Sequence, residues 1–344
     1  MTRVGLVGYG LAGAQFHAPL LRAAGLTVVA VATRNPERIA QVAADLPDAL
    51  TVPDLDALLA VPRLDLDLVV VASPSGQHVE NAQRVLDAGL AVVVDKPLAV
   101  DAASARALVD RAARQGTVLT VFHNRRYDPE YATLSKVVRS GVIGEVLRAE
   151  LRWERWRPER RERWRETQPA EQGGGLLLDL FTHLVDQVMM LFGPITTVYA
   201  ELAAHRTAAE DDAFLSLRHS SGVVSHLGAS TVVGAPGPRM RVIGMAGSYI
   251  LGSAGDEPTA FPDADGGAGQ HGWVVRGADR DPVSAEHADP ADFYRDVASA
   301  LASPDPQAGM PVDPTDAVLA LAVIDAARAS ARTSQVVTVS RPAW

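Results

Sequence analysis

The stretch that most constrains this chain is residues 4–13, which read V-G-L-V-G-Y-G-L-A-G. A short apolar run of the β type leads into glycines spaced as G-x-G-x-x-G, at Gly8, Gly10 and Gly13, and residues 14–22 read as a helix. In such a unit the first glycine permits a tight turn, the second lets backbone approach a pyrophosphate, and the third lets the helix pack on the strand. Because the phosphates would lie at the helix N-terminus, this stretch predicts a dinucleotide site, whereas isolated glycines mark only a turn.

The bulk properties exclude several classes of protein. The 344 residues are enough for two domains or one large one, and a hydrophobic content of 47% can fill a sizeable core. A formal net charge of -9 argues against a nucleic-acid-binding surface, which needs a basic excess on one face. The sequence has no cysteine, and it shows neither a secretory leader nor an apolar stretch of membrane-spanning length. The expected location is therefore the cytoplasm.

Strands and helices alternate regularly after the glycines. This alternation predicts an α/β domain with a parallel sheet, covering residues 1–122. The expected strands cover residues 27–32, 68–72, 91–94 and 117–121, and the expected helices cover residues 36–45, 54–60 and 102–115.

The end of the second expected strand bears on the choice between NAD and NADP. An NAD-specific site carries an Asp or Glu about twenty residues past the glycines, where it binds the ribose hydroxyls. Here the residues are Thr33 and Arg34, with Arg38 one helical turn further on. A carboxylate would repel a 2′-phosphate, whereas a hydroxyl and a guanidinium can bind it. A single arginine can be a plain surface residue, but the missing acid and the added cation together favour NADP.

The next strand end also carries polar groups. The strand at residues 68–72 is followed by Ser73 and Pro74, and His78 then opens a helix. Ligands of open α/β sheets bind beyond the carboxyl ends of the strands, so His78 either touches the cofactor or caps its helix.

A lysine follows the strand at residues 91–94, in the sequence Asp95-Lys96-Pro97. This position is where the reactive ring of a dinucleotide is expected to lie, and the neighbouring proline restricts the backbone. Lys96 is therefore a candidate functional residue, although a solvated loop cation or an ion pair with Asp95 would give the same pattern.

The second half of the chain changes to a period of two. In the strand expected at residues 147–153, apolar residues alternate with charged ones, which places them on opposite faces. Residues 253–289 are rich in Gly, Asp and Pro, and a loop is expected there. These patterns predict a second domain, residues 123–344, with a mostly antiparallel sheet. Further strands are expected at residues 196–203, 213–219, 223–231, 239–245, 248–251 and 336–339, and helices at residues 130–139, 290–302 and 314–331.

Residues 155–166 are rich in arginine and tryptophan. Basic and aromatic interleaving also occurs in nucleic-acid-binding segments, but here glutamates alternate with the arginines and the whole chain is acidic. We therefore interpret this segment as a salt-bridged lid over an active site or as a surface segment.

The helix expected at residues 176–192 carries Asp179, His183 and Asp186 at i, i+4 and i+7, so an α-helix would place them on one face. A carboxylate beside an imidazole fixes one tautomer and raises its basicity, as a general base requires. Three interpretations remain open: a structural histidine paired with an acid, a metal site, and catalysis. His and carboxylates are suitable metal ligands, but no third or fourth ligand has suitable spacing, so the prediction is that the site holds no metal and that the histidine is structural or catalytic.

Four stretches taken together resemble the Gfo/Idh/MocA oxidoreductase family over the whole chain. They are the G-x-G-x-x-G motif, Asp95-Lys96-Pro97 in place of the more usual Glu-Lys-Pro, H-N-R-R at residues 123–126, and D-x-x-x-H-x-x-D at residues 179–186. Within the family, the Y-G-L-A-G-x-x-F-H-A-P opening, H-N-R-R-Y-D and the R-P-E…R-W-R-E segment are similar to the NADP-dependent scyllo-inositol dehydrogenase branch.

The resemblance implies a fold and an assembly. An N-terminal Rossmann domain, with a doubly wound parallel sheet, would precede a C-terminal α/β domain with an open, mostly antiparallel sheet. The open face of that sheet would form a homodimer or a homotetramer.

The resemblance also implies roles for single residues. Lys96 would contact the reacting hydroxyl, His183 would accept or donate its proton, and Asp179 would help to bind the substrate. Asn124 and Tyr127 would line the substrate pocket. The side chain of Asp95 is one methylene shorter than the usual Glu, so its contact would change although its charge is kept. The expected cofactor-binding residues, with Trp164 and Arg165 near the nicotinamide, are Gly8, Gly10, Leu11, Ala12, Gly13, Thr33, Arg34, Arg38, Ser73, Pro74, His78, Asp95, Lys96, Trp164 and Arg165.

These features together predict a dehydrogenase that transfers hydride between NADP(H) and a CH–OH group of a small cyclic polyol or sugar, such as an inositol. One alternative is activity on another sugar or sugar derivative, because specificity depends on pocket shape and hydroxyl hydrogen bonds. The other is a regulator that binds NADP and sugar without turnover. Relatives of that kind generally lose the lysine or the histidine, which this chain keeps as Lys96 and His183. No nucleic acid or membrane partner is expected.

Overall fold

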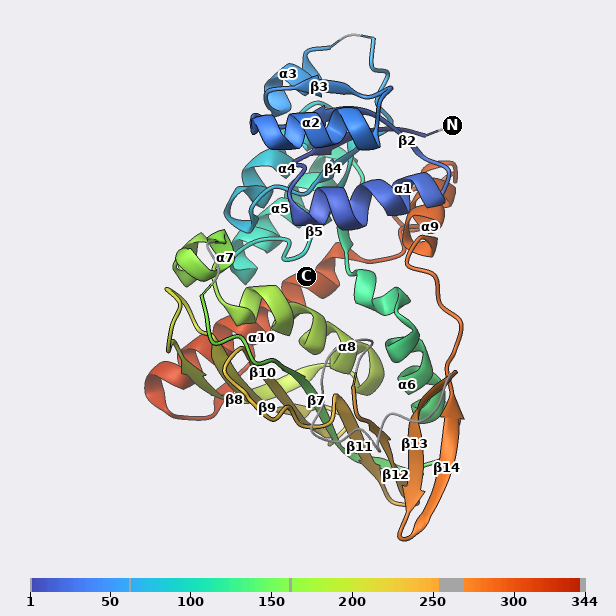
Figure 1. The fold of residues 1–344 in the computed structure, drawn as a ribbon, viewed down its shortest axis with the longest axis vertical. Helices are drawn as coiled ribbons and strands as arrows, with labels where there is room; N and C mark the ends of the chain where they lie inside the picture. The colour runs from blue at the N-terminus through green and yellow to red at the C-terminus, as the bar shows by residue number, and fades with distance from the viewer. Residues whose placement is uncertain (1, 62, 161–162, 254–268, 341–344) are drawn as a thin grey trace. The chain divides into compact units, whose positions relative to one another are not determined.

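The structure is a computed structural model of the chain, and it describes residues 2–61, 63–160, 163–253 and 269–340 (Figure 1). The chain divides into two compact units. The first unit comprises Met1–Asn124 and Pro290–Val318, and the second comprises Arg125–Asp289 and Leu319–Trp344.

In the described part of the first unit, six parallel strands form one sheet in the order β3-β2-β1-β4-β5-β6. The order reverses between β1 and β4, and ligands of open α/β sheets bind at such a switch point. The valine runs of β4 and β5 are buried, because helices cover both faces of the sheet (Figure 1). The predicted doubly wound Rossmann domain is confirmed. The strands are β1 (Arg3–Val7), β2 (Thr27–Ala32), β3 (Leu50–Val52), β4 (Leu68–Val71), β5 (Ala91–Asp95) and β6 (Leu119–Phe122).

Several helices of this unit begin at a polar side chain that caps them. The side chain of Asn35 accepts a hydrogen bond from the backbone N–H of Arg38 at the start of α2 (Pro36–Asp45). The Asp101 side chain likewise accepts from the N–H of Ser104 at the start of α5 (Ala102–Gln115). Both helices have the predicted bounds. The first predicted helix instead begins as a π-helical turn, η1 (Gly13–His17), and continues as α1 (Ala18–Ala23). The remaining elements are α3 (Leu55–Leu59), η2 (Ser75–Gln77) and α4 (His78–Asp87).

Residues Pro290–Val318 pack with the first unit, although the predicted division at residue 122 assigned them to the second domain. The apolar side of α9 (Asp292–Leu301) is buried, including Phe293 and Tyr294. The hydroxyl of Thr120 donates to the carbonyl oxygen of Val312 at 2.7 Å, which ties the returning segment to β6. The helix was predictable from its pattern, but its partner was not, because only tertiary packing selects the surface that an apolar face covers.

Among the described residues of the second unit, nine strands form a sheet in the order β14-β13-β12-β11-β7-β10-β9-β8-β15. Strands β7 and β10 run parallel, and the other described pairs are antiparallel. The predicted mostly antiparallel sheet is confirmed. The strands are β7 (Val146–Glu154), β8 (Ile195–Ala203), β9 (Asp212–His219), β10 (Val224–Ser230), β11 (Met240–Gly244), β12 (Gly247–Leu251), β13 (Gln270–Arg276), β14 (Asp279–Ser284) and β15 (Val337–Thr338).

The prediction of a loop at residues 253–289 is wrong for its second part, because this part forms the hairpin β13-β14. Residues 254–268 of that prediction lie outside the described residues. Two residues typical of loops fit this hairpin. Gly272 has a φ of +81° at a register shift, and Pro282 lies in the edge strand, where no ladder hydrogen bond needs its nitrogen.

Helices cover one face of the second sheet and leave the other face open (Figure 1). On the covered face, Leu151, Leu217, Leu227 and Val242 are completely buried. Among the described residues, no helix is long and apolar enough to cross a membrane. The helical elements are α6 (Pro129–Arg139), α7 (Trp164–Thr167), η4 (Ala170–Gln172), η5 (Leu177–Phe181), α8 (Thr182–Phe192) and α10 (Pro314–Thr333).

Candidate functional site

The glycine loop at the end of β1 packs its backbone closely against the backbone of neighbouring segments. Gly8 has a φ of +97°, and a Cβ at this position would lie 2.7 Å from the carbonyl oxygen of Ala72. A Cβ on Gly13 would lie 2.2 Å from the carbonyl oxygen of Gly8. The loop therefore lies directly against the end of β4, and η1 begins directly on β1. Leu11 and Ala12 lie between these glycines in the sequence. Leu11 is exposed, and Ala12 is half-buried. Such a loop leaves backbone accessible at a helix start, which fits a pyrophosphate.

An arginine lies over this loop. The guanidinium of Arg38 is 3.6 to 3.8 Å from where a Cβ on Gly10 would stand. Arg34 instead forms an ion pair with Asp54, which caps α3, and Thr33 is buried with its N–H bonded to Val52. The hydrogen bonds from Ala57 and Arg34 lower the pKa of Asp54. Of the two predicted arginines, Arg38 is the one that the structure brings to the glycines.

His78 joins the ends of two strands. Its Nδ1 is 2.7 Å from the carbonyl oxygen of Pro97, and its Nε2 is 2.8 Å from that of Ser73. The imidazole therefore bridges two backbone carbonyl groups. The ring is buried, so it serves to connect the turn that contains Ser73 and Pro74 to the turn after β5. Its predicted contact with the cofactor stays a prediction.

Asp95 and Lys96 stand at the carboxyl end of β5, and both are buried. An oxygen of Asp95 accepts the backbone N–H of Lys96 at 2.9 Å. Burial by itself would raise the pKa of Asp95, but His17, Lys96 and His78 outweigh it and lower the pKa to about 2. The carboxylate beside Lys96 is therefore charged at neutral pH.

The residues predicted to line the substrate pocket occupy one short turn. Asn124 and Tyr127 are the ends of a 3-10 turn, η3 (Asn124–Tyr127), and both are half-buried. Between them, Arg126 donates two hydrogen bonds to the buried carboxylate of Asp186, at 2.9 and 2.5 Å. Asp186 thus anchors this turn to α8.

Two glycines and a glutamate shape the start of the helix that carries Asp179 and His183. A Cβ on Gly174 would lie 1.9 Å from the carbonyl oxygen of Gln168, and one on Gly175 would lie 2.3 Å from Oε1 of Glu210. That oxygen accepts the N–H of Leu177 at 2.9 Å, so Glu210 caps the first turn of η5. Burial raises the pKa of Glu210. Sequence reasoning missed Glu210, because nothing local to it indicates a cap so far along the chain.

Asp179 and Arg165 come together in the second unit. Nε of Arg165 is 3.1 Å from Oδ1 of Asp179, and the guanidinium of Arg165 lies 4.4 Å from the ring centroid of Trp164. Asp179 lies in the π-helical turn η5, so its rotation relative to His183 differs from the α-helical spacing that the sequence suggested. The structure therefore brings three predicted site residues together: Trp164, Arg165 and Asp179.

His183 is buried beside Trp153, with ring centroids 6.1 Å apart. Three guanidinium groups surround this tryptophan: Arg239, Arg125 and Arg155 lie 4.1, 4.6 and 5.3 Å from its centroid. The sequence placed Trp153 only on the apolar face of its strand. The arginines come from other elements, so the cluster could not be found from sequence spacing.

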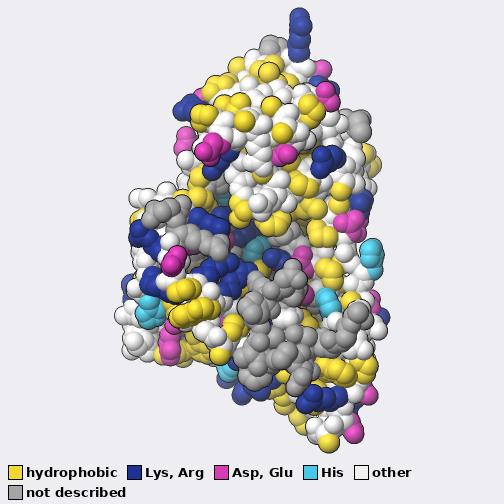
Figure 2. Space-filling view, viewed as in Figure 1, with side chains coloured by type: hydrophobic (Ala, Val, Ile, Leu, Met, Phe, Trp, Pro, Cys, Tyr) yellow, Lys and Arg dark blue, Asp and Glu magenta, His cyan; other side chains and the backbone are white. Residues whose placement is uncertain are grey.

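The role of the arginine-rich segment, as a lid or as a surface segment, stays a prediction. Arg157 and Arg160 line a shallow hollow together with Glu159 and Glu166, and Arg206 comes from another part of the chain. Figure 2 shows Lys and Arg side chains gathered on this face of the second unit. Within the described residues, no three His, Asp or Glu side chains are placed to hold a metal ion.

Comparison with known proteins finds matches over both halves of the chain. Residues 2–123 match the family described as "Oxidoreductase family, NAD-binding Rossmann fold", and residues 131–250 match "GFO/IDH/MocA C-terminal domain". The chain is 30% identical to scyllo-inositol 2-dehydrogenase (NADP(+)) of Bacillus subtilis, over 96% of this chain and 94% of that protein. It is 38% identical to the uncharacterised oxidoreductase YdgJ of Escherichia coli, over 72% and 70%. The structure of a Yersinia pestis oxidoreductase aligns over 99% of this chain and 98% of its own, with 31% identity and a TM-score of 0.85.

Replacing Gly175 by Ala should destabilise the start of the helix that carries His183. The new Cβ would displace the Glu210 carboxylate from the N–H of Leu177, and the positive φ would be strained as well. We expect the free energy of unfolding to fall by about 2–4 kcal/mol in urea denaturation. Gly277→Ala is the matched control, because its φ is +62° and nothing lies within 4 Å of its Cβ position. The control should lose only about 1 kcal/mol, and equal losses would contradict this account.

Proposed function

Because the chain belongs to the Gfo/Idh/MocA oxidoreductase family, we propose that it is an NADP-dependent dehydrogenase acting on a secondary alcohol or ketone of a cyclic polyol or sugar. The observation that carries this proposal is the placement of Lys96 at the carboxyl end of β5, beside the charged carboxylate of Asp95. A buried cation at the ligand-binding edge of a doubly wound sheet is suited to stabilise a developing alkoxide.

Each residue of the proposed mechanism has a defined task. The bound dinucleotide supplies the hydride acceptor or donor. Lys96 donates a hydrogen bond to the substrate oxygen and neutralises its charge as the alkoxide forms. His183 accepts the hydroxyl proton during oxidation and returns it during reduction. Asp179, held by Arg165, binds a substrate hydroxyl.

An uncharged polyol or sugar suits the electrostatics near His183. Among the arginines around Trp153, Arg125 pairs with Asp128, and Arg239 pairs with Glu130. Their charge is compensated within the protein, so the cluster does not call for an anionic substrate. The printed activity of the Bacillus subtilis relative, on scyllo-inositol, belongs to this class.

The preference for NADP rests on the surroundings of Gly10. Arg38 lies over the glycine loop, has no carboxylate partner among the described residues, and belongs to the first turn of α2. Thr33 stands where an NAD-specific site carries an acid. A guanidinium and a helix N-terminus at this place both favour the 2′-phosphate of NADP.

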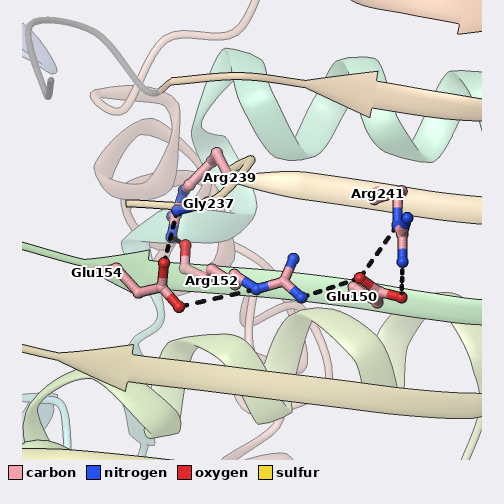
Figure 3. Close-up of polar contacts among 6 residues, drawn as sticks. All are labelled: Glu150, Arg152, Glu154, Gly237, Arg239 and Arg241. Carbon is pink, nitrogen blue, oxygen red and sulfur yellow. Dashed lines mark hydrogen bonds and ion pairs between the residues drawn. The ribbon is translucent and has the colours of Figure 1, made fainter. Parts of the chain in front are cut away.

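We also propose that a second copy of this chain covers the open face of the second sheet. Figure 3 shows a row of alternating charges there, in which Glu150 binds Arg241 and Arg152, and Arg152 faces Glu154. Phe214 is 38% exposed on the same face. A surface with both signs of charge and exposed apolar side chains is self-complementary, as a two-fold symmetric interface requires.

The variants Lys96→Ala and His183→Ala should each lower kcat by about 10²–10⁴-fold, because each removes a group that acts in the transition state. Absorbance at the nicotinamide band would be followed with NADP or NAD against inositols, aldoses and sugar acids. Binding of NADPH should change little. Lys136→Ala and His205→Ala, at exposed positions, are the controls. Wild-type rates in both test variants, or NADPH binding by wild type without turnover of any candidate, would contradict the enzyme assignment.

The variant Arg38→Ala should raise the Kd for NADPH about tenfold or more and leave the Kd for NADH within about twofold, because a charge-assisted hydrogen bond to the 2′-phosphate is lost. Titration by intrinsic fluorescence measures both constants. Arg106→Ala removes an arginine paired with Asp110 on α5 and should change neither constant. A similar weakening for both cofactors would rule out a role in recognising the 2′-phosphate.

The variant Phe214→Asp should convert the assembly to monomers, because it places a charge in the apolar part of the proposed interface. Light scattering after size exclusion gives the mass, and circular dichroism checks the fold. Met190→Asp, at an exposed position on α8, is the control and should keep the wild-type mass. A monomeric wild-type protein would refute this interface.

A further inference from the structure

A buried chain of three polar side chains ends next to Lys96. The hydroxyl of Tyr294 is 2.6 Å from Nδ1 of His17, and Nε2 of His17 is 3.7 Å from Oδ1 of Asp95. Tyr294 and His17 are completely buried, and Asp95 nearly so. The three residues come from α9, η1 and the end of β5, and all belong to the first unit.

Aromatic side chains fix the place of the His17 ring. Phe122 lies 4.4 Å from it, and Phe122 also stacks on Tyr294 with centroids 5.6 Å apart. Phe293 closes the cluster with an edge contact to Phe122 at 4.9 Å. The imidazole is thus shielded from water, so its two nitrogens depend on Tyr294 and Asp95.

The hydroxyl of Tyr294 determines where the proton of a neutral His17 ring lies. Burial, with the nearby charge of Asp95, raises the pKa of Tyr294 well above its usual value, so the phenol stays protonated. A phenol that donates to Nδ1 leaves the ring proton on Nε2, which faces Asp95. The chain therefore directs an N–H group at the carboxylate beside Lys96.

The separation of 3.7 Å is longer than a direct hydrogen bond, which needs about 3.2 Å or less. His17 therefore acts on Asp95 mainly through the direction and charge distribution of its N–H group. The same carboxylate oxygen accepts the backbone N–H of Lys96, so any rotation of Asp95 is transmitted to the lysine.

We propose that His17 and Tyr294 are positioning residues for Lys96: they orient the Asp95 carboxylate that determines the placement of the lysine. This proposal rests on the proposed function of Lys96. It assigns tasks to two residues that the dehydrogenase mechanism does not use directly. The hydrogen bond with Tyr294 fixes the orientation of the His17 ring. The ring in turn orients the Asp95 carboxylate beside Lys96.

Two amide substitutions test the contacts of the two His17 ring nitrogens one at a time. Gln at position 17 places an N–H donor near the original Nε2, on the side of Asp95, whereas Asn places its amide near the original Nδ1, on the side of Tyr294. We expect His17→Gln, which loses the bond to Tyr294 but keeps a donor toward Asp95, to lower kcat about tenfold, and His17→Asn, which loses the donor toward Asp95, to lower it about 100-fold. The Kd for NADPH should stay within about twofold in both variants. Equal kcat values in the two variants would overturn the proposal, because a purely structural histidine would not distinguish its two sides.

A second pair of variants controls for the loss of a buried hydroxyl. Tyr294→Phe removes the bond to His17, and Tyr249→Phe removes a bond to the carbonyl oxygen of His271 from an equally buried ring. We expect Tyr294→Phe to lower kcat about tenfold and Tyr249→Phe to leave it unchanged, with similar losses in Tm. Equal kcat values in this pair would also overturn the proposal.

The tautomer of His17 can be measured without turnover. In ¹⁵N NMR spectra of the ring nitrogens, the wild-type protein should carry the proton on Nε2, and Tyr294→Phe should redistribute it. A wild-type proton on Nδ1 would overturn the proposal. A wild-type protein that oxidises no polyol or sugar but shows the Nε2 tautomer would instead refute the proposed function, so the two failures are distinguishable.

Discussion

The first unit depends on the contact of backbone with backbone at its glycine loop. A side chain on Gly13 would collide with the carbonyl group of Gly8, and one on Gly8 would collide with that of Ala72. Because neither side chain exists, the first helix begins directly on β1 and the loop lies against the end of β4. Parallel strands bring their carboxyl ends to one edge of the sheet. The glycine loop therefore lies at the same edge of the sheet as Ser73 and Lys96.

Charged groups near the predicted site residues are buried in compensating pairs. In the first unit, Asp95 lies beside Lys96, whose charge helps to lower the pKa of this carboxylate, and in the second unit Arg126 binds Asp186. Removing a charge from water is costly unless an opposite charge or a hydrogen bond compensates for it. Paired in this way, the charges are held in fixed directions. Fixed charges can stabilise a developing alkoxide without the reorganisation that water would require.

Two helices that carry residues of interest begin with a π-helical turn. η1 ends at His17, and η5 contains Asp179. A π turn is wider than an α turn, so side chains on either side of it are rotated away from the α-helical spacing. The Asp179 side chain is accordingly one-third exposed, whereas His183 is buried one turn later. The pattern i, i+4, i+7 had placed these residues on one face, because residue spacing alone does not reveal a widened turn.

The sequence alone determined the doubly wound domain, the mostly antiparallel second sheet and the bounds of α2 and α5, because caps, glycines and periodicity are local signals. It did not reveal the β13-β14 hairpin, since Gly272 and Pro282 are typical of loops and only pairing at a sheet edge accommodates them. Only the tertiary structure decided that Glu210 caps η5 and that Tyr294 meets His17, 277 positions away. Such contacts depend on which surfaces pack together, and no local pattern encodes that choice.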